Sequence, residues 1–391
     1  MAHMSSETRR RHRVTCAPRL SLALEAELQA LGLTIAGRDH TGVELDCTMT
    51  QAMQILLHSR IAFHVLQRFA DLWAKDADGL YEGAVILPWE RVIPADGYVC
   101  VTSVVDNPTI RNSMFANVRL KDAIVDHISD RVGRRPDAGA NIDRAVVHLY
   151  WKHEDAKVWL SLSGRKLSDR GYRRLPGKAP LRETIVAAML LEAQYDGTRP
   201  LVVPFCGSGT IAIEAALIAT GRAPGLLRTN MGIQHLETFN SQAWGSTRLQ
   251  AKKTRRKDSP APIIASDIDE DMVHAAYRNA VTAGVDQLIE FHCCDFSNTP
   301  LPKIPGTIML HGEYGQRLDT GEDLRGTYGR IGDYLKQCCA GWDAWVFTER
   351  SLLGAVGLKA TQRTPYLNGD IDCRFARYEL YDGVRQGATD K

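Results

Sequence analysis

Two glycines stand where an apolar strand turns into an apolar helix, in the segment Pro204-Phe205-Cys206-Gly207-Ser208-Gly209-Thr210. Glycines at such a turn let a ligand approach the backbone, and the helix N-terminus offers free N–H groups and a partial positive charge. The segment therefore suits a phosphate or a carboxylate. It is not the dinucleotide pattern, because residue 212 is alanine, and it is not a P-loop, because no Gly-Lys-Ser/Thr follows. On glycine spacing alone, a tight turn without a ligand remains open.

Acidic residues follow the next two apolar segments. Asp267 and Asp269 come directly after residues 263–265, and Asp295 with Phe296 comes after residues 288–293. An acid at the end of the second strand of an open α/β sheet commonly binds the ribose hydroxyls of a nucleotide-type cofactor. An acid with an aromatic after the third strand could contact an adenine amine and ring face. Each acid alone is more often a helix cap, but three of them around a glycine loop indicate a binding site.

The elements that would position these residues alternate regularly after Leu181, which predicts a parallel, doubly wound α/β sheet. The expected strands are residues 199–204, 262–266, 288–293, 306–311, 343–348, 358–363 and 372–380. The expected helices are residues 182–194, 210–220, 269–283 and 321–340. The last two strands are expected to form a hairpin through Pro365 and Gly369, as in class I methyltransferases. Residues 221–261 interrupt the alternation.

The first 165 residues have a mixed α+β pattern. The expected strands are residues 14–16, 43–47, 98–105, 145–151 and 157–163, and the expected helices are residues 20–31 and 117–132. A further helix, capped by Thr50, is expected to include Ile55, Leu56, Ile61 and Val65.

The segment from Gly164 to Pro180 is strongly basic, and Asp169 is its only acid. Its basic residues are Arg165, Lys166, Arg170, Arg173, Arg174 and Lys178. A second basic run lies at residues 252–257. Such a loop suits the phosphates of a nucleic acid, and a solvated loop without a partner is the alternative.

Composition and charge exclude several classes of protein. The 391 residues carry a net charge of +2, and residues 1–180 hold 25 basic and 21 acidic side chains. The longest apolar run, residues 185–191, is far shorter than the about 18 residues that a membrane span requires. Nine cysteines without a metal-ligand spacing, and the lack of a signal peptide, predict free thiols, no metal and a cytoplasmic location.

Several segments together resemble a known family. Residues 203–216 (VPFCGSGTIAIEAA) are similar to the DPFCGSGTxxIEAA stretch of THUMP-containing RNA methyltransferases, in particular those that methylate the guanine N2 amine in 23S ribosomal RNA. Residues 161–164, 170–173, 179–184, 266–269 and 368–374 resemble other parts of these proteins. The resemblance covers most of residues 145–380.

The resemblance implies S-adenosylmethionine as cofactor and ribosomal RNA as partner. It also implies a ferredoxin-like segment (13–65), a THUMP-like RNA-binding domain (66–165) and a Rossmann-like methyltransferase domain (181–391). The residues themselves predict a tag and disordered N-terminus (1–12), since residues 1–4 resemble a cloning scar, and a basic linker (166–180). The implied cofactor-binding residues are Thr184, Pro204, Phe205, Gly207, Gly209, Thr210, Asp267, Ile268, Asp295 and Phe296.

Two departures from the family pattern affect the expected chemistry. Val203 replaces the Asp that begins the glycine motif, and His311-Gly312-Glu313-Tyr314 replaces the catalytic Asn-Pro-Pro-Tyr. The resemblance implies that Tyr314 stacks on the target base, while Glu313 or neutral His311 accepts a hydrogen bond from the amine. We therefore expect an RNA methyltransferase. The alternative is a catalytically impaired homologue that acts as an RNA-binding or ribosome-assembly protein.

Overall fold

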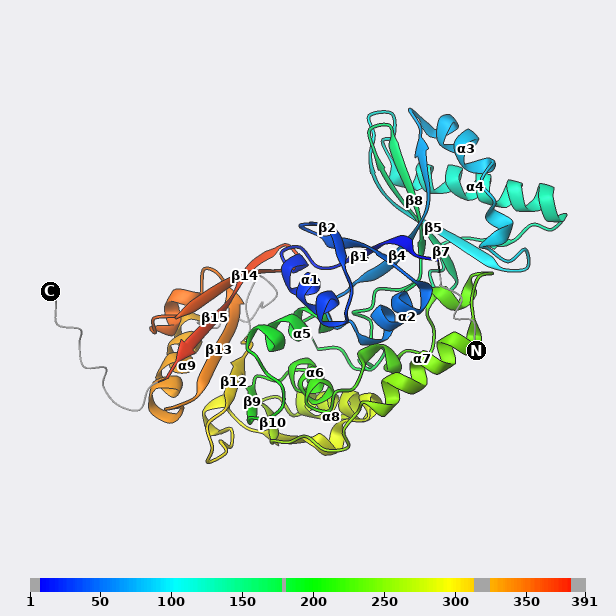
Figure 1. Ribbon diagram of the computed structural model, residues 1–391. Helices are drawn as coiled ribbons and strands as arrows, with labels where there is room; N and C mark the ends of the chain where they lie inside the picture. The colour runs from blue at the N-terminus through cyan, green and yellow to red at the C-terminus, as the bar shows by residue number, and fades with distance from the viewer. Residues whose placement is uncertain (1–7, 178–180, 313–323, 381–391) are drawn as a thin grey trace. The chain divides into compact units, whose positions relative to one another are not determined.

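The chain forms two compact units (Figure 1). The computed structural model describes residues 8–177, 181–312 and 324–380. The first unit comprises Met1–Asp169 and Pro224–Lys253, and the second comprises Arg170–Ala223 and Thr254–Lys391.

The first unit is built on an eight-stranded sheet with the order β2-β3-β1-β4-β8-β7-β5-β6. The strands are β1 (Arg10–Thr15), β2 (Ile35–Asp39), β3 (Gly42–Cys47), β4 (His64–Trp73), β5 (Tyr98–Asp106), β6 (Asp137–Ala138), β7 (Ala145–Lys152) and β8 (Asp155–Ser161). Its helices up to residue 169 are α1 (Ser21–Ala30), α2 (Met49–His58), α3 (Ala77–Val85), the short η1 (Trp89–Arg91) and α4 (Ser113–Val132). The mixed α+β character that the sequence predicted for this region is confirmed.

The start of this unit differs from the prediction in three places. Strand β1 begins at Arg10, so the prediction that residues 1–12 are disordered is wrong for residues 10–12. Thr48, not Thr50, caps α2, through a capping box with Gln51. The helix then ends at His58, and Val65 lies in β4, because a buried β-branched residue at the centre of a sheet fits the strand pattern as well as the helix pattern.

Residues 224–253, which interrupt the α/β alternation, fold as part of the first unit. They form η2 (Pro224–Leu227), η3 (Gly232–His235) and α7 (Ser241–Lys253). A Cβ atom at Gly232 would lie 2.3 Å from the carbonyl oxygen of Ser161, so only glycine allows this close approach. The buried Arg228 guanidinium donates to the carbonyl oxygens of Ser163, Arg165 and Lys166, each at 3.2 Å. These contacts fix the insertion against the end of β8.

The second unit contains a seven-stranded sheet with the order β11-β10-β9-β12-β13-β15-β14. The strands are β9 (Leu201–Pro204), β10 (Ile263–Asp267), β11 (Ile289–Cys293), β12 (Thr307–Leu310), β13 (Asp343–Glu349), β14 (Gln362–Asn368) and β15 (Ile371–Glu379). The helices are α5 (Glu183–Glu192), α6 (Thr210–Ala219), α8 (Glu270–Ala283) and α9 (Leu324–Cys338), with short turns η4 (Asp286–Leu288), η5 (Phe296–Asn298) and η6 (Leu353–Val356). The sheet is parallel except for β15, which pairs antiparallel with β13 and β14. The predicted Rossmann-like class I methyltransferase fold is confirmed.

The terminal hairpin lies later than predicted. Strand β14 covers residues 362–368 instead of 358–363, and Pro365 lies within the strand rather than in the connection. Proline is tolerated there because β14 is at the edge of the sheet, where its missing N–H interrupts no ladder on the outer side. Gly369, with φ +64°, makes the tight turn.

Among the residues that the structure describes, no helix has the length and apolar character needed to cross a bilayer.

Candidate active site

The glycine loop leaves the carboxyl end of β9, at the centre of the second sheet. Gly207 and Gly209 adopt φ values of +50° and +87°, which glycine reaches without strain. A Cβ atom at residue 209 would lie 2.9 Å from the Cβ of Ala276 in α8, so this glycine also permits close packing of α6 against α8. At Gly207, by contrast, no described heavy atom lies within 4 Å of such a Cβ atom, which leaves open space above the loop.

The first turn of α6 is suited to an anion. No described side chain caps this turn, so its leading N–H groups remain available as donors. Thr210, the first residue of the helix, is buried, and its Oγ1 accepts a hydrogen bond from Arg173 Nη2 at 3.1 Å. The loop therefore provides backbone donors in a region that Arg173 makes positive.

Asp267 connects the end of β10 to the glycine loop. Its Oδ2 accepts a hydrogen bond from Gly207 N at 2.9 Å, and its Oδ1 accepts one from Asp269 N at 3.1 Å. A carboxylate oxygen has two acceptor positions, so both oxygens keep capacity for a ligand hydroxyl. Asp269 instead caps α8 by accepting from Asp271 N at 2.9 Å. Between the two acids, Ile268 is 71% exposed, an unusual position for a large apolar side chain at a polar sheet edge.

Asp295 and Phe296 follow β11 as predicted, but the ring of Phe296 is covered. It stacks on Phe205 with centroids 4.9 Å apart, meets Tyr334 edge-on at 5.7 Å, and has the Arg330 guanidinium 4.9 Å from its centroid. Phe296 is 5% exposed, so these neighbours leave little of its ring accessible, and its expected contact with an adenine stays a prediction. Asp295 is paired with Arg330 at 2.9 Å.

His311 directly follows β12, which pairs in parallel with β9, the strand that leads into the glycine loop. Its ring centroid lies 5.7 Å from that of Phe347, and burial lowers the pKa of His311 to about 4. The imidazole is therefore neutral near pH 7 and has one acceptor nitrogen. At Gly312 a Cβ atom would lie 3.3 Å from the Tyr328 hydroxyl, so Tyr328 leaves little room for a larger residue. Glu313 and Tyr314, the other predicted catalytic residues, lie outside the described residues.

Thr184 and Glu183 begin helix α5. Thr184 is fully buried, and among the described residues its Oγ1 has no hydrogen-bond partner. Such an orphan hydroxyl is costly unless a ligand or water satisfies it. Glu183 lies 3.1 Å from Arg173, and burial raises the pKa of Glu183 to about 7 although Arg173 opposes the shift. Arg173 thereby connects the starts of α5 and α6.

Two residues predicted to bind RNA have structural roles instead. Arg170 is 1% exposed, and its Nε lies 3.5 Å from Oε1 of the fully buried Glu214 in α6. Tyr172 donates to the same oxygen at 3.2 Å. Arg173 is held by Glu183, Thr210 and the carbonyl oxygen of Leu181. The RNA-binding assignment of Arg170 and Arg173 is therefore wrong, because neither guanidinium is free to reach a phosphate.

The other basic residues of this segment are at the surface. Arg165 is paired with Asp143 and lies 3.8 Å from Asp169. Lys166 is exposed, with its amine 5.5 Å from the Phe63 ring centroid, and Arg174 is also exposed. Lys178 lies outside the described residues.

Sequence reasoning missed Arg330 and Glu214. Both are in correctly predicted helices, but nothing in their spacing links Arg330 to Asp295, 35 residues away, or Glu214 to Arg170. For Glu214 a signal existed: apart from Thr210 at its start, the other residues of this helix are apolar, and an acid in such a helix requires a partner.

Comparison with known proteins agrees with this architecture. A family model described as "RMKL-like, methyltransferase domain" matches residues 170–377, more than half of the chain, and a THUMP domain model matches residues 74–156. The ribosomal RNA large subunit methyltransferase K/L of Psychromonas ingrahamii is 32% identical over 368 residues, which are 92% of this chain and 49% of that protein. The chain spans about half the length of the curated relatives that it matches.

Two solved structures share the fold over nearly the whole chain. One is from Listeria monocytogenes, described as a predicted N6-adenine-specific DNA methylase, with a TM-score of 0.84, 28% identity, and coverage of 95% of this chain and 96% of that one. The other is a protein crystallised with SAH, with a TM-score of 0.85 and 22% identity, covering 97% of this chain and 100% of that one. With the match over residues 170–377, the chain belongs to the RMKL-like methyltransferase family.

Proposed function

We propose that this protein is an S-adenosylmethionine-dependent RNA methyltransferase that modifies the exocyclic N2 amine of a guanine in 23S ribosomal RNA. The observation that carries the proposal is the glycine loop pinned by Asp267 at the carboxyl edge of a sheet in an RMKL-like domain. The proposed methyltransferase domain, residues 181–391, overlaps the matched range 170–377. The proposed THUMP-like domain, residues 66–165, contains the matched range 74–156.

The cofactor-binding side chains fit an adenosyl ligand with an amino-acid tail. The uncapped turn of α6, the orphan Thr184 hydroxyl and the space above Gly207 suit the tail, and Asp267 suits two ribose hydroxyls. Ile268 offers the apolar surface that an adenine ring needs, and Asp295 offers an acceptor for its amine. When bound, S-adenosylmethionine supplies the electrophilic methyl group.

The protein's task at the reacting centre is to orient the guanine amine. His311 lies at the end of β12, and its neutral imidazole can accept a hydrogen bond from the amine. Glu313 and Tyr314 follow it in the sequence, where we assign them a second acceptor and the stacking surface. Replacing His311 with Ala is expected to reduce kcat about 10–100-fold, whereas Asn, which restores an acceptor, is expected to retain most activity.

We assign RNA binding to exposed residues of the first unit and to Lys166 and Arg174. On one face of the first unit's sheet, Tyr150 is 42% exposed and pairs in register with Lys157, and Trp73 is 62% exposed with the Lys75 amine 5.2 Å from its ring centroid. Exposed aromatic rings beside lysines suit stacked bases and neighbouring phosphates of single-stranded RNA.

Methyl transfer from labelled S-adenosylmethionine to unmodified 23S ribosomal RNA tests the activity. We expect transfer to guanine-containing transcripts and none to transcripts with inosine in place of guanosine, since inosine lacks the N2 amine. RNA binding without any transfer would refute the enzymatic proposal and leave the RNA-binding alternative.

Fluorescence titration with single-stranded RNA tests the binding surface. Trp73→Ala and Tyr150→Ala are each expected to weaken binding about fivefold or more, because each removes a stacking platform. Ile86→Ala is the matched control, since Ile86 is a similarly exposed apolar residue, 78% accessible, just after α3 in the same unit. Equal affinities for all three variants would contradict the assigned surface.

A further inference from the structure

Asp295 is held by more donors than a helix cap requires. Its Oδ1 accepts from the backbone N of Ser297 at 3.0 Å, from Ser297 Oγ at 2.6 Å and from Arg330 Nη2 at 3.0 Å. Its Oδ2 accepts from the same Arg330 nitrogen at 2.9 Å. Among the described residues, Oδ1 thus has three donors and Oδ2 has one, so the remaining acceptor position is on Oδ2.

Arg330 also contacts the aromatic side of this site. Its guanidinium lies 4.9 Å from the centroid of Phe296, and Phe296 stacks on Phe205 of the glycine loop. One side chain of α9 therefore fixes both residues that follow β11. The Arg330 side chain is 59% exposed, and an ion pair this accessible contributes little to folding stability. The main consequence of the Arg330 contact is therefore that it fixes the orientation of the Asp295 carboxylate.

We propose that Arg330 is a positioning residue that orients Asp295 toward the 6-amino group of the cofactor's adenine, so that the site selects 6-amino over 6-oxo purines. This inference rests on the proposed function, since it requires that the domain bind S-adenosylmethionine. We assign Arg330 no contact with the reacting atoms, and its proposed effect on purine selection is exerted through Asp295.

The charge state of Asp295 supports the selectivity. Burial alone would raise the pKa of Asp295, but the hydrogen bonds from Ser297 and Arg330 outweigh burial and lower the pKa below its ordinary value. The ionised carboxylate only accepts hydrogen bonds. It can therefore accept a hydrogen bond from the N–H of a 6-amino group. The oxygen of a 6-oxo group is itself an acceptor, so it cannot form a hydrogen bond with the carboxylate.

Calorimetric titration of the full chain with S-adenosylhomocysteine and S-inosylhomocysteine tests the inference. For the unmodified protein we expect the adenosyl compound to bind about 100-fold more tightly, since a site built around a hydrogen bond strongly rejects the analogue that cannot make it. Arg330→Gln is expected to weaken adenosyl binding about 10-fold and to reduce the preference to about 10-fold or less. Arg330→Lys should restore part of the preference.

Two further variants separate positioning from a structural effect. Asp295→Asn is expected to abolish the preference, because a carboxamide can donate to a 6-oxo group. Lys336→Gln is the matched control: Lys336 lies on the same helix, 3.6 Å from Asp333 in an exposed pair, and its loss should change neither affinity. Thermal unfolding of each variant verifies that the fold is retained.

The outcomes distinguish the two proposals. An adenosyl preference in Arg330→Gln equal to that of the unmodified protein, whether or not both affinities fall together, would overturn the role of Arg330 while leaving the proposed function intact. Absence of binding of either compound to the unmodified protein would overturn the proposed function and this inference with it.

Discussion

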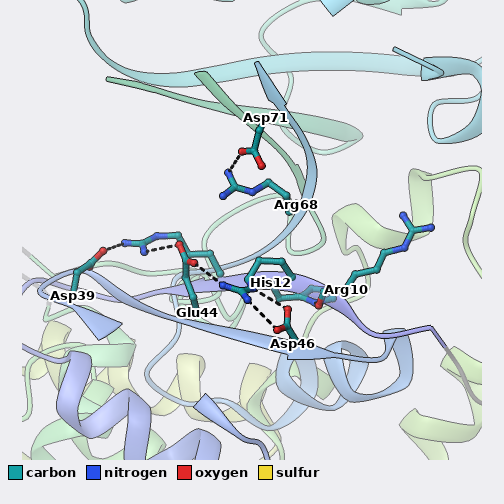
Figure 2. Close-up of polar contacts among 9 residues, drawn as sticks. Arg10, His12, Asp39, Glu44, Asp46, Arg68 and Asp71 are labelled. Atoms are coloured by element: carbon teal, nitrogen blue, oxygen red, sulfur yellow. Dashed lines mark hydrogen bonds and ion pairs between the residues drawn. The ribbon is translucent and has the colours of Figure 1, made fainter. Parts of the chain in front are cut away.

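One ion-pair network in each unit illustrates two opposite environments: the network on β1 of the first unit is exposed, and the Arg170–Glu214 pair of the second unit is buried. In the first unit, Arg11 and Arg13 on β1 pair with Asp39 of β2 and with Glu44 and Asp46 of β3 at the surface of the sheet, as Figure 2 shows for these three acids. The Arg11 and Asp46 side chains are 42% and 47% exposed. In the second unit, Arg170 and Glu214 are 1% and 0% exposed.

The difference shows why a count of charges says little about stability. Exposed pairs gain weak attraction in water and typically contribute less than about 1 kcal/mol. A buried pair has lost its hydration, so removing one partner leaves an uncompensated charge and costs about 3–5 kcal/mol. The same residue types thus serve as a solvated surface in one unit and as an essential internal contact in the other.

The largest expected effect comes from breaking the buried pair. Glu214→Ala should lower the free energy of unfolding by about 3–5 kcal/mol, because Arg170 and Tyr172 would lose their shared acceptor. Urea denaturation measures this change. The double variant Arg170→Met/Glu214→Leu, which removes both charges, should recover most of the loss. If Glu214→Ala were as stable as the unmodified protein, the Arg170–Glu214 pair would not be buried in solution.

Acidification should stabilise the second unit through Glu183. Its folded pKa is raised to about 7, so between about pH 4.5 and 7 the unfolded chain is ionised while the folded form is not, and stability is lost as the pH rises through this window. Lowering the pH from about 7.5 to 5 should therefore raise the free energy of unfolding of the second unit by about 2 kcal/mol. Hydrogen exchange in α5, measured at both pH values, reports this change. Glu183→Gln should abolish the pH dependence, and a persistent dependence would assign it to another group.

The first unit should respond to acid in the opposite direction. Burial lowers the pKa of His12 to about 4, so its stabilising contribution is present above about pH 6.5 and is lost as the pH falls toward 4. At pH 5 the unit should be about 2 kcal/mol less stable than at pH 7.5 from this group alone. His64 and His148, with pKa values lowered to about 3 and about 4, act in the same sense. The hydrogen-exchange protection factors in β1 and β4, which are corrected for the intrinsic exchange rate at each pH, should fall at pH 5, and His12→Asn should reduce that fall.

The smallest effect is expected at the exposed pairs of the first unit. Arg11 lowers the pKa of Asp46 through a hydrogen bond, yet both groups are accessible to water. Arg11→Ala should change the free energy of unfolding by less than about 1 kcal/mol, and about 1 M NaCl should reduce the difference further. A loss of stability as large as that expected for Glu214→Ala would show that the exposed pairs contribute as much as the buried pair.

Much of the second unit was predictable because its local patterns agree with its global fold. The apolar strands, the glycine loop and the acids after β10 and β11 are local features, and parallel strands bring their carboxyl ends to one edge. Strand β4 and helix α3 in the first unit were not predicted. In β4 the apolar residues of a central strand do not alternate cleanly, and α3 has only nine residues. The hairpin strand β14 was misplaced because Pro365 reads as a turn unless its edge position is known.

The sequence by itself determined the fold class, the glycine loop and the acids around it, because each depends on residue type at short spacing. Only the tertiary structure decided which of the charged side chains are exposed and can bind a ligand. Arg165, Lys166, Arg170, Arg173 and Arg174 belong to one basic run, but Arg170 and Arg173 are held inside the second unit by Glu214 and Glu183, while Lys166 and Arg174 face water. Burial and partner geometry, which depend on contacts between distant segments, separate these roles, and no local pattern records them.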